Sequence, residues 1–324
     1  MITRLFSLCL LLTTFCLAIA CGGGGGSDAT ASSTVSGALY SVDYLESVVN
    51  QPSMTGSYVS STSFGELKGA TSGARALYVG AQADAGELQP QLKLALKYGA
   101  ISSANLTGTY HVVAYGLADS ASQVSVAQYS LDFSSEPPSI VTEGVASNAA
   151  GISGMLPSGS DNFIVGLDGK VTWGDWVGGV SENEKTLLLS KNKVFLLGSK
   201  VATAQNLLEG QTANMVLLFQ YDQPSQNTGS AYGSLSFSGG EMTSTVQEDN
   251  LTTSSDSNFP NSGSRYFAQD GSASSLIKLY SSSSYVLGTT TPNEQGFVGS
   301  EEFLVVINPD NSVRPSLSIG IFED

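Results

Sequence analysis

Cysteine and histidine are nearly absent from this chain of 324 residues. It has three cysteines and one histidine, and Cys9 and Cys16 lie in the apolar stretch that opens the sequence. If that stretch is removed during maturation, only Cys21 remains, which excludes a disulfide within the chain and a zinc site built on cysteines. His111 stands alone in a strand-like segment, TYHVVAYG, and no G-x-S-x-G motif accompanies it. We therefore expect His111 to be structural, and we predict no Ser-His-Asp catalysis, no metal and no cofactor.

Charged residues are also scarce, and most of them are acidic. They make up 13% of the chain, and the net charge is −15 at pH 7. A chain this acidic repels nucleic acid and anionic lipid headgroups, so we predict no nucleic-acid partner. The acidic residues are scattered along the sequence, which is typical of a solvated surface rather than a charged tail.

The polar residues that take the place of charged ones favour strands over helices. Serine, threonine and glycine are abundant, whereas glutamate, lysine and arginine, which helices favour, are few. Asp168-Gly169 and Asp270-Gly271 are typical of tight turns. The segment VSVAQYSLDF alternates, so one face of a predicted strand carries four apolar side chains: Ala127, Tyr129, Leu131 and Phe133. We therefore predict an all-β protein.

Internal repeats organise most of the chain. Three similar stretches, TGSYVSSTSFG, SGSDNFIVGLDG and SGSRYFAQDG, begin at Thr55, Ser158 and Ser262, about 104 residues apart. Each continues into a strand–turn–strand segment: GATSGARALYV, GGVSENEKTLLL and GFVGSEEFLVV. Each then ends in a short apolar strand: LKLALKYG, VFLLGSK and LSIGIF. The segments between the copies, TGTYHVVAYG and TANMVLLFQYD, also resemble each other, so the basic unit is about 52 residues long.

The repeats predict five antiparallel β-meander modules in one domain over residues 37–324. The modules lie near 54–100, 106–152, 157–200, 211–256 and 261–322. Meanders of this length fit a β-propeller of about five blades, one four-stranded blade for each module. Alternatively, pairs of modules close as tandem eight-stranded up-and-down barrels, which leaves one module unpaired. We take the propeller as the expectation and the barrels as the alternative.

Both tryptophans of the chain, Trp173 and Trp176, lie in the tetrapeptide WGDW. Exposed on a rigid turn, indole rings can stack on sugars or anchor a protein partner. These two residues are therefore our candidates for ligand or partner contact. The alternative is that one or both fill the core between sheets.

The N-terminus carries the most specific motif. Arg4 precedes an apolar run that ends at Ala20 and is short for a membrane span. The segment over 1–20 resembles a bacterial lipoprotein signal peptide, with AIAC, residues 18–21, in the lipobox position and Ala18 where that family prefers leucine. The resemblance implies cleavage after Ala20, a diacylglycerol on the Cys21 sulfur, and a further acyl chain such as palmitate on the new amine. Two or more chains anchor a protein stably. The alternatives are an ordinary secretory signal with a chance cysteine and a retained membrane helix.

The same resemblance gives the expected location. Gly22 stands where aspartate would retain a lipoprotein in the inner membrane, which implies anchoring in the outer membrane, facing either the periplasm or the cell surface. Residues 21–36, rich in glycine and serine, are predicted to form a flexible tether. The repeat region loosely resembles uncharacterised repeat-bearing envelope lipoproteins.

From these features we expect a lipid-anchored cell-envelope protein with a non-catalytic binding or structural role. Its expected partners are the membrane, through the acyl chains on Cys21, and a glycan or protein ligand. The alternative is an envelope hydrolase that acts through a pair of carboxylates, which two distant acidic residues could supply.

Overall fold

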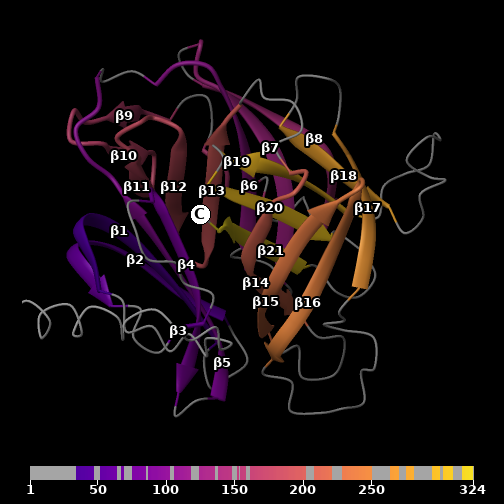
Figure 1. Ribbon diagram of the computed structural model, residues 1–324. Helices are drawn as coiled ribbons and strands as arrows, with labels where there is room; N and C mark the ends of the chain where they lie inside the picture. Colours follow the sequence, from indigo (N-terminus) through magenta and orange to yellow (C-terminus); the bar gives the residue numbers. More distant parts are fainter. Residues whose placement is uncertain are drawn as a thin grey trace, which may run out of the picture. The chain divides into compact units, whose positions relative to one another are not determined.

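β-strands form the framework of the chain (Figure 1). The computed structural model describes residues 34–46, 52–63, 67–68, 75–84, 87–102, 106–117, 124–135, 138–147, 152, 154–157, 161–201, 208–220, 228–249, 263–269, 275–280, 294–299, 302–308 and 316–323. The predicted signal peptide, Cys21, most of the tether and the Asp270-Gly271 turn lie outside these residues. Within them, no helix is long and apolar enough to cross a membrane.

The N-terminal sheet contains the first five strands: β1 (Thr34–Glu46), β2 (Pro52–Ser63), β3 (Leu67–Lys68), β4 (Leu77–Asp84) and β5 (Glu87–Lys97). Their order is β2-β1-β5-β4-β3. The first strand therefore pairs with the last, antiparallel, from Leu39 opposite Lys97 to Leu45 opposite Gln91. Because β1 has β5 on one side and β2 on the other, β2 is an edge strand.

The middle sheet contains eight strands: β6 (Thr109–Gly116), β7 (Ser125–Asp132), β8 (Ser139–Ser147), β9 (Phe163–Val165), β10 (Lys170–Trp173), β11 (Trp176–Val180), β12 (Thr186–Lys191) and β13 (Val194–Lys200). Their order is β8-β7-β6-β13-β12-β11-β10-β9. Again the first strand pairs with the last, from Tyr110 opposite Lys200 to Gly116 opposite Val194. Among the described strands, none pairs with β8 or β9 on its outer side, so these two are the edges of an open sheet.

The last eight strands close into a barrel: β14 (Thr212–Gln220), β15 (Thr228–Ser238), β16 (Glu241–Asp249), β17 (Gly263–Gln269), β18 (Leu276–Tyr280), β19 (Glu294–Gly299), β20 (Phe303–Asn308) and β21 (Ser316–Phe322). β14 pairs with β21, from Ala213 opposite Phe322 to Phe219 opposite Ser316. β16 also pairs with β17, which closes the position that is open in the middle sheet. Figure 1 shows these strands wrapped around one interior.

The all-β prediction is confirmed, but the β-propeller is wrong. A propeller blade would leave the final apolar strand of each module at the edge of a four-stranded sheet. Instead, β13 and β21 are buried along nearly their whole length and each has a strand on both sides. The barrel alternative is confirmed for the last eight strands only, since the middle sheet follows the same plan without closing.

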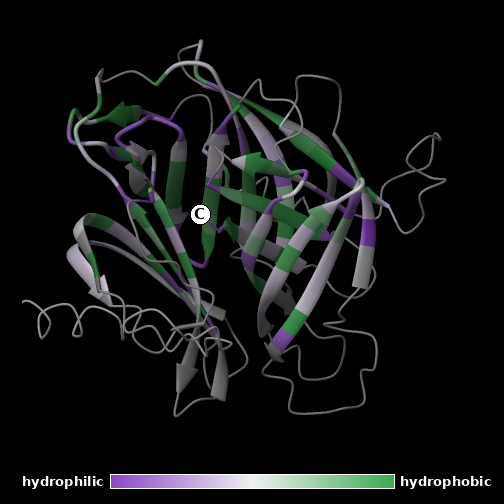
Figure 2. Ribbon diagram, viewed as in Figure 1, coloured by the Kyte–Doolittle hydropathy of each residue, from purple (hydrophilic) through white to green (hydrophobic). Residues whose placement is uncertain are grey.

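Three large apolar clusters hold the strands together. One lies on a single face of the middle sheet and includes Tyr129, Trp173 and Trp176. A second fills the barrel and includes Phe237 and Leu304. The largest joins residues of all three sheets, such as Leu94, Phe195 and Ile319. Figure 2 shows the hydrophobic residues concentrated on the strands.

The predicted alternation along β7 is confirmed. Ala127, Tyr129, Leu131 and Phe133 all belong to the cluster on one face of the middle sheet, whereas Val126 belongs to the cluster shared by the three sheets. His111 is buried on β6, and its ring lies 6.1 Å from that of Phe297 in the barrel. The histidine is therefore a packed strand residue, as expected.

The Asp168-Gly169 turn is also confirmed. It follows β9, and Gly169 takes a φ of +82°, which favours glycine. The N–H of Gly169 donates to the carbonyl of Gly166 over 2.9 Å. This turn brings Asp168 and Lys170 to the site described below.

Glu294 gives the barrel a pH-dependent contribution to stability. Its side chain is 15% exposed and lies 3.7 Å from the Nε of Arg265. Burial raises the pKa of the Glu294 carboxyl, and the positive charge of Arg265 offsets only part of that effect. Because the folded state favours the protonated acid, this group stabilises the fold most at pH values below its ordinary pKa, and the contribution is lost as the pH rises.

We expect the Glu294→Gln variant to lack this loss of stability with rising pH. Urea unfolding of both proteins at pH 4, 5.5 and 7 tests the expectation, because the two proteins share all their other carboxyl groups and differ only at this one. The stability of the variant relative to the parent should rise from pH 4 to pH 7. A difference that stays constant across this range would contradict the assignment.

Candidate functional site

The WGDW segment forms the tight hairpin between β10 and β11. Trp173 and Trp176 pair directly across it, and Gly174 at the first turn position has a φ of +59°. Their side chains are 0% and 1% exposed. The expectation of exposed indoles is therefore corrected: strand alternation turns both rings toward the same face as Val171, and both fill the core.

Packing and hydrogen bonding explain why both tryptophans are buried. The Trp176 Nε1–H donates to the carbonyl of Met155 over 2.9 Å, which fixes the connection between β8 and β9 against the sheet. The Trp173 ring stands edge-on to that of Phe163, with the centroids 5.3 Å apart. The residues between and beside the two tryptophans are the ones that reach the surface.

The opposite face of the middle sheet meets β2 of the N-terminal sheet. The Tyr58 hydroxyl on β2 donates to the carbonyl of Gly178 on β11. The hydroxyls of Tyr40 on β1 and Ser190 on β12 lie 2.5 Å apart. A Cβ atom on Gly56 would stand 2.2 Å from the Tyr40 hydroxyl and 2.3 Å from the Ser190 hydroxyl, so a larger residue there would have to displace these two side chains.

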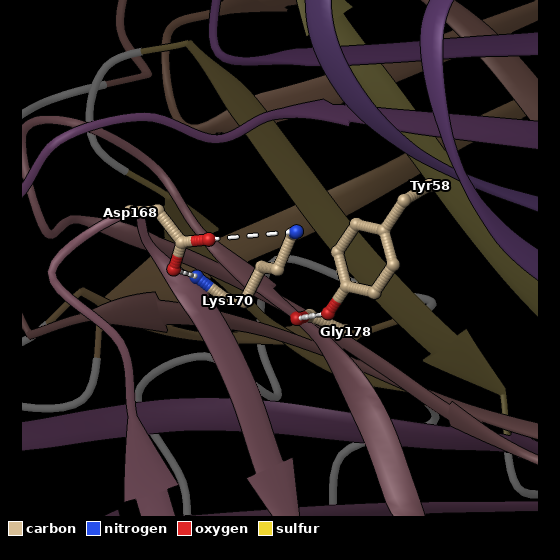
Figure 3. Close-up of polar contacts among 4 residues, drawn as sticks. All are labelled: Tyr58, Asp168, Lys170 and Gly178. Carbon is tan, nitrogen blue, oxygen red and sulfur yellow. Dashed lines mark hydrogen bonds and ion pairs between the residues drawn. The ribbon is translucent and has the colours of Figure 1, made fainter.

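Lys170 extends from β10 to the same junction (Figure 3). Its ammonium lies 5.1 Å from the centroid of the Tyr58 ring, a cation–π contact. The ammonium is also 3.5 Å from Asp168 Oδ2, and the Lys170 backbone N–H donates to Asp168 Oδ1 over 3.2 Å. The aspartate therefore positions the lysine over the tyrosine ring.

The electrostatics of the junction favour hydrogen bonding over acid–base chemistry. Burial raises the pKa of Tyr58, and the neighbouring Tyr40, Tyr98 and Asp168 raise it further. Burial also raises the pKa of Tyr40, despite its contact with Ser190. Both phenols are protonated at neutral pH, so each can donate a proton in a hydrogen bond but does not act as a base. Among the described residues, no three His, Cys, Asp or Glu side chains are grouped to hold a metal.

A pocket of about 370 Å³ opens beside this junction, and we call it the β2 pocket. Its polar rim includes Asp175 and Lys191, whose carboxylate and ammonium lie 3.2 Å apart. It is lined by Met54, Gly56, Asp175, Val177, Ser190, Lys191 and Asn192. It thus combines an apolar surface, an ion pair, a hydroxyl and an amide, a set that can hold a polar ligand or the end of a peptide.

Exposed apolar side chains lie in the β2 pocket and elsewhere on the middle sheet. Val177 lines the pocket and Ile164 lies in the same row across β10, whereas Leu167 belongs to the turn at the other end of that strand. Among the described residues, four large hydrophobic side chains are exposed, and all belong to the middle sheet or its turns. Ile164, Leu167 and Val177 are 52%, 64% and 41% exposed and come from β9, the following turn and β11. Val141, the fourth, lies on β8, at the other edge of the sheet. Clustered exposed apolar surface marks interaction sites more often than single exposed residues do.

The sequence predicted the segment that lines the β2 pocket, but not the residues of that segment that do so. WGDW contributes Asp175 to the pocket and Val177 follows it, whereas Trp173 and Trp176 lie on the opposite face. The sequence did not predict Lys170 and Tyr58 as site residues, because a contact between two stacked sheets leaves no local pattern in either strand. The one available signal was the recurrence of the TGSY stretch around Gly56, which marked β2 as part of a repeat.

Comparisons with known proteins add only distant similarity to solved structures. No protein-family model matches the sequence, and no curated protein matches it. Among solved structures, the chain is similar to the isotype 1 transferrin binding protein B of serogroup B Neisseria meningitidis. The identity is 10%, the match covers 90% of this chain and 77% of that one, and the TM-score is 0.29. At that score the likeness carries no inference about arrangement or ligand.

Proposed function

We propose that this chain is a lipid-anchored protein of the cell envelope that binds a ligand without catalysis at the β2 pocket. The observation that carries the proposal is a pocket whose lining contains an ion pair and the exposed side chain of Val177, with the exposed Ile164 in the same row across the sheet. The lipobox-like stretch before Cys21 supports the anchor. A tether of glycine and serine would let a folded domain reach a ligand while it stays attached to the outer membrane.

The anchor is tested by Cys21→Ser. Without the sulfur no thioether can form, so we expect the variant to incorporate no labelled palmitate and to leave the membrane fraction. Cys16→Ser is the matched control, because that cysteine lies in the segment expected to be removed and should not affect labelling. Labelling that persists in Cys21→Ser would refute the lipobox assignment.

Binding is tested with Val177→Asp. A screen of the mature chain against glycans and envelope-derived peptides should yield a ligand whose affinity this variant lowers about tenfold or more, since the substitution places a charge on the apolar side of the pocket. Val141→Asp is the matched control, because Val141 is exposed at the opposite edge of the sheet. Turnover of a glycan, lost on replacing a pair of carboxylates, would instead support the hydrolase alternative.

A further inference from the structure

We propose that the free edge of β2 and the uncovered part of the middle sheet receive one extended strand of a partner protein, with apolar residues at alternate positions. This inference rests on the proposed binding function and names its ligand class. It draws on three observations: the N-terminal sheet stacks on the middle sheet, β2 has a free hydrogen-bonding edge, and exposed apolar side chains of β9 and β11 lie below that edge.

The N-terminal sheet covers the middle sheet only in part. Tyr40 on β1 reaches Ser190 on β12, and Tyr58 on β2 reaches Gly178 on β11. Moving by one strand in the N-terminal sheet, from β1 to β2, thus corresponds to moving by one strand in the middle sheet, from β12 to β11. The next step would place a strand over β10 and β9, and no described strand pairs with β2 on that side.

The edge of β2 presents backbone groups in the right direction. The carbonyl of Ala38 on β1 accepts from the N–H of Tyr98, just after β5, over 3.2 Å. Pairing directions alternate along an antiparallel strand. Following that alternation through the register of β1 with β5 and β2, the N–H and C=O groups of Met54, Gly56 and Tyr58 point away from β1. An added strand can pair with these groups, as in β-strand addition to a sheet edge.

The surface beside this edge is partly apolar where such a strand would lie. Ile164, Thr172 and Val177 are direct neighbours across β9, β10 and β11. The same row continues into Ser190, which the N-terminal sheet buries. The exposed row is therefore the uncovered continuation of an existing contact between sheets, and inward apolar side chains of an added strand would cover it.

A strand explains these features better than a glycan does. A glycan would satisfy the pocket rim but would leave the backbone groups of β2 without strand partners and the apolar row exposed. A strand satisfies both, and the Asp175–Lys191 ion pair at the pocket rim can hold a polar or charged group at its end.

Displayed nine-residue peptides provide the first test. One library alternates apolar and polar residues, and a second has the same composition with the apolar residues in one block. We expect the mature chain to enrich the alternating library about tenfold over the blocked one. Equal enrichment, or none, would overturn the proposal of an added strand. The proposed function would survive that result if the chain binds another ligand in a way that Val177→Asp weakens.

The selected peptide then tests the hydrogen bonds directly. Methylating its backbone nitrogens at every second position removes the donors on one side of the strand. We expect one of the two methylated registers to bind about tenfold more weakly and the other to bind nearly as well as the parent peptide. Equal binding by both would show that no strand pairing occurs, and this comparison requires no change in the protein.

Variants of the chain locate the site. Val177→Asp should weaken the parent peptide about tenfold, whereas Val141→Asp should leave its affinity unchanged. Tryptophan fluorescence checks that both variants are folded, since both indoles are buried. Sedimentation of the mature chain gives the remaining outcome: a dimer that Val177→Asp dissociates would mean that a second copy covers the surface, which overturns the proposal of a partner strand.

Discussion

Trp176→Ala is expected to destabilise the fold by about 3–5 kcal/mol. The indole is 1% exposed and belongs to the cluster on one face of the middle sheet, so its removal leaves a large cavity among side chains that can relax only in part. The variant also loses the hydrogen bond to the carbonyl of Met155, which would hold the connection between β8 and β9 less firmly. Urea unfolding at neutral pH measures the loss.

Trp176→Phe separates the two causes. Phenylalanine keeps most of the apolar volume but lacks the N–H donor, so we expect a smaller loss of about 1–3 kcal/mol. A loss in Trp176→Ala of less than about 1 kcal/mol, near what a surface substitution causes, would mean that this side chain is not part of the core.

Gly296→Ala is expected to produce the second large effect. A Cβ atom on this β19 residue would stand 1.8 Å from the carbonyl oxygen of Val305 on β20, and a backbone atom cannot move aside as a side chain can. Gly178 on β11 is the corresponding residue of the middle sheet, and its Cβ would stand 1.9 Å from the carbonyl oxygen of Leu188. We expect each alanine variant to lose about 2–4 kcal/mol, since overpacking here requires strands to separate.

Gly320→Ala is the matched control in the same barrel. Its nearest contacts would be side-chain atoms of Leu304, Ala213 and Leu235 at 3.1–3.3 Å, which can adjust by a few tenths of an ångström. Its unfolding free energy should therefore fall by clearly less than that of Gly296→Ala. Equal losses in the two variants would show that backbone contact is not the reason for glycine at position 296.

The repeats predicted where the strands of this protein lie better than they predicted how the sheets close. The alignment placed Gly178 and Gly296 at one repeat position, and both meet a carbonyl of the next strand in the same way. Alternation along β7 also identified its buried face correctly. The pairing of β6 with β13 and of β14 with β21 was not visible, because strand pairing across a whole repeat leaves no periodicity in either strand.

The candidate site was harder to predict for a related reason. Trp173 and Trp176 were predicted to contact a ligand because they are large aromatic residues close to glycines. A two-residue hairpin places them on the same face of the sheet, and that face packs into the core. Lys170, Tyr58 and Gly56 matter through contacts between two sheets. Sequence patterns report which side of one strand is buried, whereas such contacts depend on how finished sheets stack.

The pairing of first with last strands has a consequence for how the chain folds. The barrel cannot close before β21 is available, because its first strand, β14, pairs with residues 316–322, the last of its eight strands. Contacts so distant in sequence carry a large loop-closure cost and slow folding. While β21 is still on the ribosome, β14 lacks one of its two partner strands and the barrel cannot close.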